Sequence, residues 1–272
     1  MKDTFFSSSR FMDLCRKEMV ESWRTNVLRM VMIFGIMVVW FVGSAYFTYR
    51  SWPVGSETDA MVSNSLNFFL AFGAICGLAL ASNTFDTLKT RSSRLSVLMT
   101  PATPFEKFFS RWMISTIVYI VVFIILFMLA DYTRVFIYRF IYPDATIIPA
   151  SLKYLVITGS EYSLSGSSMG YKILSYFSFQ SFFLLGSVIW PKNSFIKTLT
   201  AGLFIMITYS LFAAGVARML RGENIYINNS SFGDVSMDAL KIINMVILVF
   251  FIFFNWVIAY YRFKESEIIN RP

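Results

Sequence analysis

The residues of this chain with the clearest local chemistry lie at positions 103–106, which read T-P-F-E. A threonine three residues before a glutamate forms a capping box, in which the Thr103 hydroxyl accepts from the Glu106 amide and the Glu106 carboxylate accepts from the Thr103 amide. Pro104 then takes the first helical position, where its missing N–H breaks no hydrogen bond. The pattern predicts a sharply defined helix start at Thr103.

The helix that begins here is expected to be amphipathic. Its apolar face has spacings of three and four residues and comprises Phe105, Phe108, Phe109 and Trp112. Its other side comprises Glu106, Lys107, Ser110 and Arg111. An upstream apolar run over 95–99 ends at Thr100-Pro101, which predicts a second short helix and a bend. Such a helix either lies in the lipid headgroup layer or docks on a cytoplasmic partner.

The sequence contains no recognisable motif for catalysis or metal binding. Histidine is absent, and Cys15 and Cys76 lack the spacing of a metal site. None of the 13 glycines precedes a lysine, which excludes a phosphate-binding G-x-x-x-x-G-K-[ST] loop. We therefore expect no catalytic residue, no metal and no cofactor on this chain, so that any ATP would be bound elsewhere.

Composition indicates an all-α polytopic membrane protein. Hydrophobic residues make up 56% and charged residues only 15%, whereas soluble domains carry about 25% charged residues. The mean hydropathy is +0.60. The net charge of +8 is better explained by basic cytoplasmic loops than by nucleic-acid binding.

Six apolar segments of spanning length are predicted near 27–48, 67–84, 112–130, 173–190, 198–217 and 242–261. With both termini in the cytoplasm, the inside segments carry 16 of the 24 Lys and Arg residues, as the positive-inside rule requires. The predicted organisation is an N-terminal region 1–26, a six-span domain 27–262 and a cytoplasmic tail 263–272.

Residues 10–26 are predicted to form an amphipathic helix in the membrane interface. One set of residues at helical spacing comprises Phe11, Leu14, Cys15, Glu18, Met19 and Trp23, and the remaining positions include Asp13, Arg16, Lys17 and Glu21. The alternative is a solvated extension of the first span.

Small and neutral polar residues inside the predicted spans have two interpretations. They are Gly73, Gly77, Gln180, Asn244 and Asn255. Close helix packing and interhelical hydrogen bonding explain them most simply. They could instead line a substrate path, and a mainly apolar path would suit a hydrophobic or amphipathic substrate. Glycines and serines over 159–170 predict a flexible loop.

The stretch R-L-S-V-L-M-T-P-A-T-P-F-E-K-F at 94–108 resembles the L-L-x-T-P-x-S/T-P-x-E loop of type-2 ATP-binding-cassette (ABC) transporter permeases. The residues at 183–188 and 192–198 are similar to the connection between spans four and five in Bacteroidetes-type members. The resemblance implies an N-terminal interfacial helix, six spans and a coupling helix between spans two and three. Against this pattern, the outer loop 131–172 is longer than expected.

The resemblance also implies partners and roles. A separate cytoplasmic ATPase would bind ATP and magnesium, and a second permease copy, identical or different, would complete an exporter in a bacterial inner membrane. The coupling helix would present Thr103, Pro104, Phe105, Glu106, Lys107, Phe108, Phe109 and Arg111 to the ATPase. Asp13, Arg16, Lys17 and Glu18 would add contacts from the interfacial helix. Transport would follow alternating access.

Two alternatives need no ATPase. A stand-alone secondary transporter or channel would act on a gradient, although ionisable groups at mid-membrane, which ion coupling favours, are not evident. A membrane anchor or accessory subunit would use the amphipathic stretch only to contact lipid.

Overall fold

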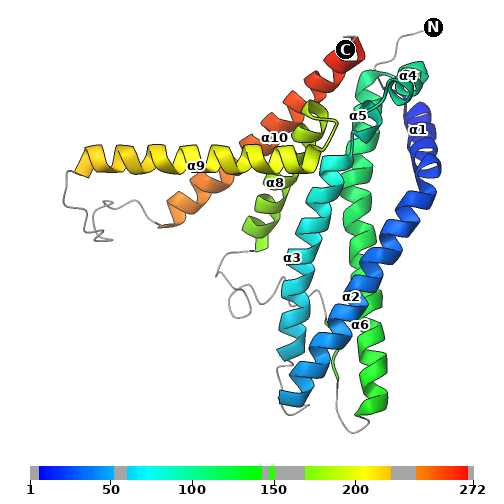
Figure 1. The fold of residues 1–272 in the computed structure, drawn as a ribbon, viewed down its shortest axis with the longest axis vertical. Helices are drawn as coiled ribbons and strands as arrows, with labels where there is room; N and C mark the ends of the chain where they lie inside the picture. Colours follow the sequence, from blue (N-terminus) through cyan, green and yellow to red (C-terminus); the bar gives the residue numbers. More distant parts are fainter. Residues whose placement is uncertain (1–5, 52–59, 143–146, 151–168, 222–236, 269–272) are drawn as a thin grey trace. The chain divides into compact units, whose positions relative to one another are not determined.

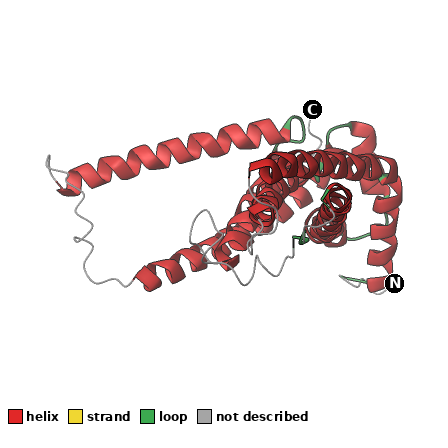
Figure 2. Cartoon of the chain, turned by 90° about the horizontal axis from the view of Figure 1, so that it is seen from below, coloured by secondary structure: helices red, strands yellow, loops and turns green. Residues whose placement is uncertain are grey.

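The computed structural model describes residues 6–51, 60–142, 147–150, 169–221 and 237–268, and all regular structure within these ranges is helical (Figures 1 and 2). This confirms the predicted all-α class. Six helices in the described ranges are long and apolar enough to cross a membrane: Trp23–Arg50, Met61–Leu88, Pro104–Ile141, Gly170–Ile189, Ser194–Gly215 and Ile242–Ser266. They match the six predicted spans. Of the predicted flexible loop 159–170, residues 159–168 lie outside the described residues, and Met169 and Gly170 are the first two residues of a helix.

The chain divides into two compact units, Met1–Leu80 with Thr100–Ile173, and Ala81–Met99 with Leu174–Pro272. The helices of the first unit are α1 (Ser8–Glu21), α2 (Trp23–Ser51), most of α3 (Ala60–Asn83), α5 (Pro104–Met113) and α6 (Tyr119–Ile141). The second unit contains a 3-10 turn at Asp86–Leu88, α4 (Arg91–Met99), most of α8 (Met169–Ile189), α9 (Ser194–Arg221) and α10 (Met237–Ile268).

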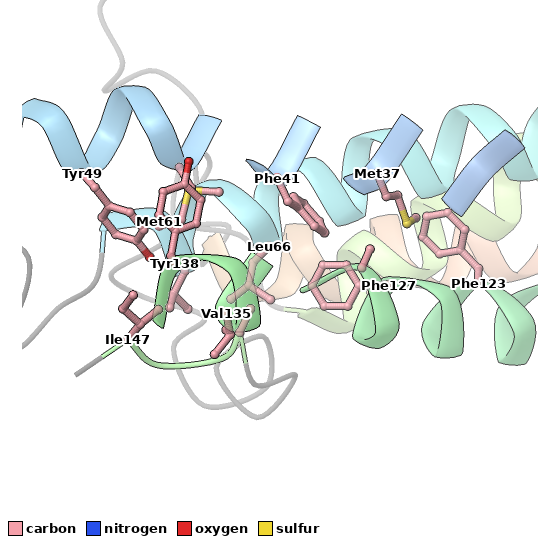
Figure 3. Close-up of a cluster of buried hydrophobic side chains, with 14 of the residues drawn as sticks. Met37, Phe41, Tyr49, Met61, Leu66, Phe123, Phe127, Val135, Tyr138 and Ile147 are labelled. Atoms are coloured by element: carbon pink, nitrogen blue, oxygen red, sulfur yellow. The ribbon is translucent and has the colours of Figure 1, made fainter. Parts of the chain in front are cut away.

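The core of the first unit forms where α2, α3 and α6 run alongside one another (Figures 1 and 3). Buried residues of α2 recur every four positions, at Met37, Phe41, Ala45 and Tyr49, so that they form one stripe of the helix. The Phe41 ring meets the edge of Phe127 from α6, with centroids 5.6 Å apart.

Helices α5 and α6 are joined by a π-helical turn at Ile114–Val118, and together they make a helix of 38 residues. At about 1.5 Å per residue it is about 57 Å long, against a hydrocarbon layer of about 30 Å. Only the stretch 112–130 is free of charged residues. The predicted amphipathic helix is therefore the projecting first part of the third spanning helix, ahead of its apolar stretch.

Gly73 allows close approach between α3 and α6, as predicted for a helix-packing glycine. A Cβ at this position would lie 2.7 Å from a ring carbon of Phe123. The Tyr119 hydroxyl donates to the Gly73 carbonyl at 2.7 Å. Gly77, one turn further along α3, is buried.

The second unit contains an equally close contact between α8 and α9. The two helices are linked by a short turn in which Asn193 takes a left-handed conformation, φ 55°, which asparagine tolerates better than most residues. A Cβ at Gly186 would overlap the side chain of Thr198. Close packing of α8 on α9 therefore requires glycine at position 186. This position lies in the segment 183–188, one of the two that resemble the connection between spans four and five of the permease family.

Candidate functional site

One carboxylate, that of Glu106, serves the N-termini of two helices. The predicted capping box is present: Glu106 N–H donates to the Thr103 hydroxyl at 3.3 Å, and Thr103 N–H donates to Glu106 Oε2 at 3.0 Å. The other oxygen, Oε1, accepts from Ser7 N–H at 2.8 Å. Ser7 is the N-cap residue of α1. Glu106 therefore fixes the start of α1 as well as the start of its own helix.

Arg10 completes this site by donating to both Glu106 oxygens at 2.9 and 3.1 Å. The Glu106 side chain is fully buried, whereas that of Arg10 is 39% exposed. Burial by itself raises the pKa of Glu106, but the hydrogen bonds from Arg10, Thr103 and Ser7 outweigh it and lower the pKa to about 2. Glu106 is consequently a permanent anion at neutral pH.

Two further side-chain contacts hold the N-terminal helix in place. We call the whole set, in which Ser7, Arg10, Lys17 and Glu18 contact Glu106, Thr100 and Arg111, the α1–α5 clamp. Arg111 Nε donates to Glu18 Oε1 at 2.8 Å, and Lys17 Nζ donates to the Thr100 hydroxyl at 3.1 Å. Burial raises the pKa of Glu18 even though the Arg111 charge acts in the opposite direction. Figure 1 shows the two helices beside one another at one end of the unit.

Aromatic rings fill the space between the two helices. Phe6 meets the edge of Phe105 at 6.5 Å, and Phe11 lies 5.4 Å from Phe109. Phe105 and Phe109 are themselves stacked at 5.7 Å, and Phe109 stacks on Trp112 at 5.4 Å. The apolar face predicted for α5 is thus occupied in large part by the N-terminal segment of the same chain.

Helix α1 has three faces rather than the two predicted. Its packed face comprises the buried Phe11, Leu14 and Cys15 with the half-buried Glu18. A second, exposed face comprises Met12, Arg16, Met19, Val20 and Trp23 just beyond the helix end. A third comprises the exposed charges Asp13, Lys17 and Glu21. An exposed apolar face beside a charged one is the arrangement of a helix lying in the membrane interface.

The eight residues expected to contact an ATPase are for the most part withdrawn from the surface. Glu106, Lys107 and Phe108 are buried. The other five are half-buried: Thr103, Pro104, Phe105, Phe109 and Arg111. Every residue of α5 is buried or half-buried.

Helix α4, by contrast, carries an exposed stripe. Ser92, Leu95, Ser96 and Met99 are all exposed, at spacings of three and four residues that place them on one side of the helix. Met99 is 81% exposed and Leu95 is 55% exposed. Val97, off this stripe, is buried. The short helix between spans two and three thus keeps a mixed apolar and hydroxyl surface open.

A buried ion pair at the other end of the first unit was not among the predicted sites. Arg134 Nε donates to Asp131 Oδ1 at 2.8 Å, and both side chains are almost wholly buried. Arg134 also donates to the Tyr49 hydroxyl at 2.6 Å and to the Ile148 carbonyl at 3.1 Å. Asp131 accepts from Ala150 N–H at 2.6 Å. The opposite charges at i and i+3 were the available sequence signal.

The neutral polar residues predicted inside the spans have different environments. Asn255 is buried and donates to the Ser181 hydroxyl at 3.1 Å, which joins α10 to α8. Gln180 is buried, whereas the Asn244 side chain is exposed. The hydrogen-bonding interpretation thus holds for Asn255.

The six long apolar helices of the described residues are compatible with a multi-pass membrane protein. Within the described residues, no group of three His, Cys, Asp or Glu side chains is placed to hold a metal ion. No protein-family model matches the chain, and searches of curated proteins and of solved structures find no match either.

Proposed function

We propose that this chain is the permease subunit of an ATP-driven exporter and that a separate cytoplasmic ATPase docks on α4. The observation that supports this most directly is the exposed stripe Ser92, Leu95, Ser96 and Met99 on a short helix between the second and third spanning helices. Apolar side chains held on a short helix suit insertion into a groove of a partner protein.

The α1–α5 clamp would pass a movement at such a docking site on to the spanning helices. Four residues, Thr100–Thr103, connect α4 to the start of α5. Because α5 continues into α6, and α1 is followed after Ser22 by α2, a displacement passed to Glu106 reaches two spanning helices. In this proposal α4 receives the force, and the clamp makes the first and third spans respond together.

In this scheme ATP and magnesium belong to the ATPase, and a second permease copy completes the path. Both termini and α4 would face the cytoplasm of a bacterial cell. Asp13, Lys17 and Glu21 would then lie on the water side of α1.

The test is affinity purification of the tagged protein from native membranes in mild detergent, with mass spectrometry of the proteins that remain bound. We expect an ATPase in a ratio near one to one. Leu95→Asp and Met99→Asp should release it, because each places a charge where an apolar contact is proposed. Glu265→Ala removes an exposed residue whose ion pair with Arg262 is local, and it should leave binding intact.

The outcomes separate the alternatives. An ATPase that stays bound to Leu95→Asp and Met99→Asp but is released by Phe105→Asp and Phe108→Asp would return the docking face to α5. Transport by the purified chain alone, driven by an ion gradient, would instead establish a secondary transporter.

A further inference from the structure

A groove of about 790 Å³ runs along α2 in the first unit, on a side of α2 away from the buried stripe, and Asn64 of α3 also lines it. Gly35 and Gly43 are among its lining residues, and a Cβ at either would meet no atom within 4 Å. Trp40 and Phe47 form its walls and are 50% and 70% exposed. Trp40 is held by stacking on Phe68 at 4.8 Å. The groove is open and mainly apolar.

The groove is polar at one end only. From Gly35 to Gly43 its α2 lining is apolar, whereas Ser44, Thr48 and Asn64 line the part near the ends of α2 and α3. The Ser44 and Thr48 hydroxyls donate to α2 carbonyls. The exposed Asn64 amide is therefore the group at this end that is placed to bond an outside molecule.

A positive charge extends the same face of α2. Arg50 lies three residues beyond Phe47 and seven beyond Gly43, so that helical geometry places all three on one side. Its guanidinium is exposed and makes one long contact, 3.4 Å to the Tyr46 hydroxyl. Arginine is well suited to binding phosphate because it offers paired donors.

The depth of the groove matches one leaflet of a bilayer. Gly35 to Thr48 covers about 20 Å of helix at about 1.5 Å per residue. One leaflet contributes about 15 Å of hydrocarbon, with the headgroup layer above it. The apolar part of the groove would face the acyl region, while Asn64 and Arg50 would lie at headgroup level.

We propose that this groove binds a phospholipid, with one acyl chain between Trp40 and Phe47 and its phosphate at Arg50. A bare apolar face would fit any lipid tail or another helix equally well. The polar and cationic end gives the occupant a direction and a headgroup, which favours a phospholipid over a second copy of this chain. The inference is independent of whether an ATPase docks on α4.

The experiment uses the full-length protein in nanodiscs that contain phosphatidylglycerol with a diazirine in one acyl chain. After photolysis, labelled peptides are mapped by mass spectrometry. We expect labelling to concentrate on 35–50, several-fold above the level on the exposed face of α9 around Phe204 and Ile207. Gly43→Leu should fill part of the groove, since a Cβ at position 43 meets no atom within 4 Å, and it should reduce labelling of 35–50 on the order of tenfold.

Three further variants sharpen the result. Arg50→Gln should reduce labelling on the order of tenfold, because one charge-assisted contact is lost. Gly215→Leu is the matched control, since Gly215 also has open space but lies on α9, and labelling should not change. Gly35→Leu repeats the test if Gly43→Leu is poorly folded by size-exclusion chromatography.

Two outcomes would overturn the proposal. Equal labelling of α2 and α9, insensitive to Gly43→Leu, would mean that only non-specific boundary lipid covers the groove. Efficient disulfide formation between copies carrying Gly43→Cys, together with absence of lipid label on 35–50, would mean that a second copy occupies this face.

Discussion

The substitution Glu106→Gln should open the α1–α5 clamp while leaving the spanning helices folded. The carboxylate accepts from the backbone of two helix starts and from Arg10. A neutral amide has one acceptor oxygen, so that it can keep the bond from Thr103 or the bond from Ser7 but not both, and it loses the charge-assisted bonds. Losing a helix cap costs about 1 kcal/mol, and hydrogen bonds to a charged group contribute about 1.5–3 kcal/mol. Allowing for the exposure of Arg10, we expect a total cost of about 2–3 kcal/mol.

The buried thiol of Cys15 reports this opening. Cys15 is 4% exposed and lies on the packed face of α1, and burial followed by the nearby Glu18 charge raises the pKa of its thiol. Maleimide reacts with the thiolate only after α1 opens. In a Cys76→Ala background, labelling of Glu106→Gln should be roughly 30- to 100-fold faster than that of the parent, because each 1.4 kcal/mol is about tenfold.

The matched control is Glu21→Gln on the same helix. Glu21 is 62% exposed, and its contact with Lys17 is 3.7 Å long, so that it contributes little. Labelling of this variant should stay within about twofold of the parent. If Glu106→Gln also stayed within twofold, Glu106 would not hold α1 to α5 and our account of the clamp would be wrong.

Three further predictions concern pH, the buried ion pair and the α8–α9 contact. Because the folded pKa of Glu106 is about 2, below its unfolded value, its contribution is complete at neutral pH and is lost as pH falls from about 4 towards 2. Cys15 exposure after acid pulses should follow this course, and the pH dependence should be weaker in Glu106→Gln, where Glu18 is the carboxylate of the clamp that still titrates. Arg134→Gln leaves the Asp131 carboxylate buried without its cation and should destabilise the protein by about 3 kcal/mol in thermal unfolding, with Asp131→Asn in the same chain restoring part of the loss. Gly186→Ala should destabilise by about 1–3 kcal/mol through overlap with Thr198, and Thr198→Ala should relieve it; an unchanged melting temperature would contradict the close contact.

Local patterns predicted the features that depend on near neighbours in the chain. The six spanning helices follow from long apolar runs, because crossing a membrane requires each run to be apolar over its length. The Thr103–Glu106 capping box follows from a spacing of three residues. Close packing at Gly73 follows from the absence of a side chain inside such a run. The geometry behind these features is nearly independent of the rest of the fold.

Contacts between residues that are far apart in the sequence could not be predicted from local patterns. Arg10 and Ser7 contact Glu106 across more than 90 residues of sequence, and no periodicity relates them. The same is true of Arg134 and Tyr49. Sequence spacing placed Met19 and Trp23 on one face with Phe11, but only the position of α5 decides which part of that face is covered.

The sequence by itself determined that the chain is helical, where its apolar spans lie and where a helix starts at Thr103, since each depends on hydrogen bonds or hydropathy within a few turns. The tertiary structure alone decided that the predicted docking residues of α5 are withdrawn and that α4 keeps an exposed stripe. The physical reason is that exposure depends on which distant element covers a surface, and in this chain the N-terminal aromatic residues Phe6 and Phe11 cover the aromatic face of α5.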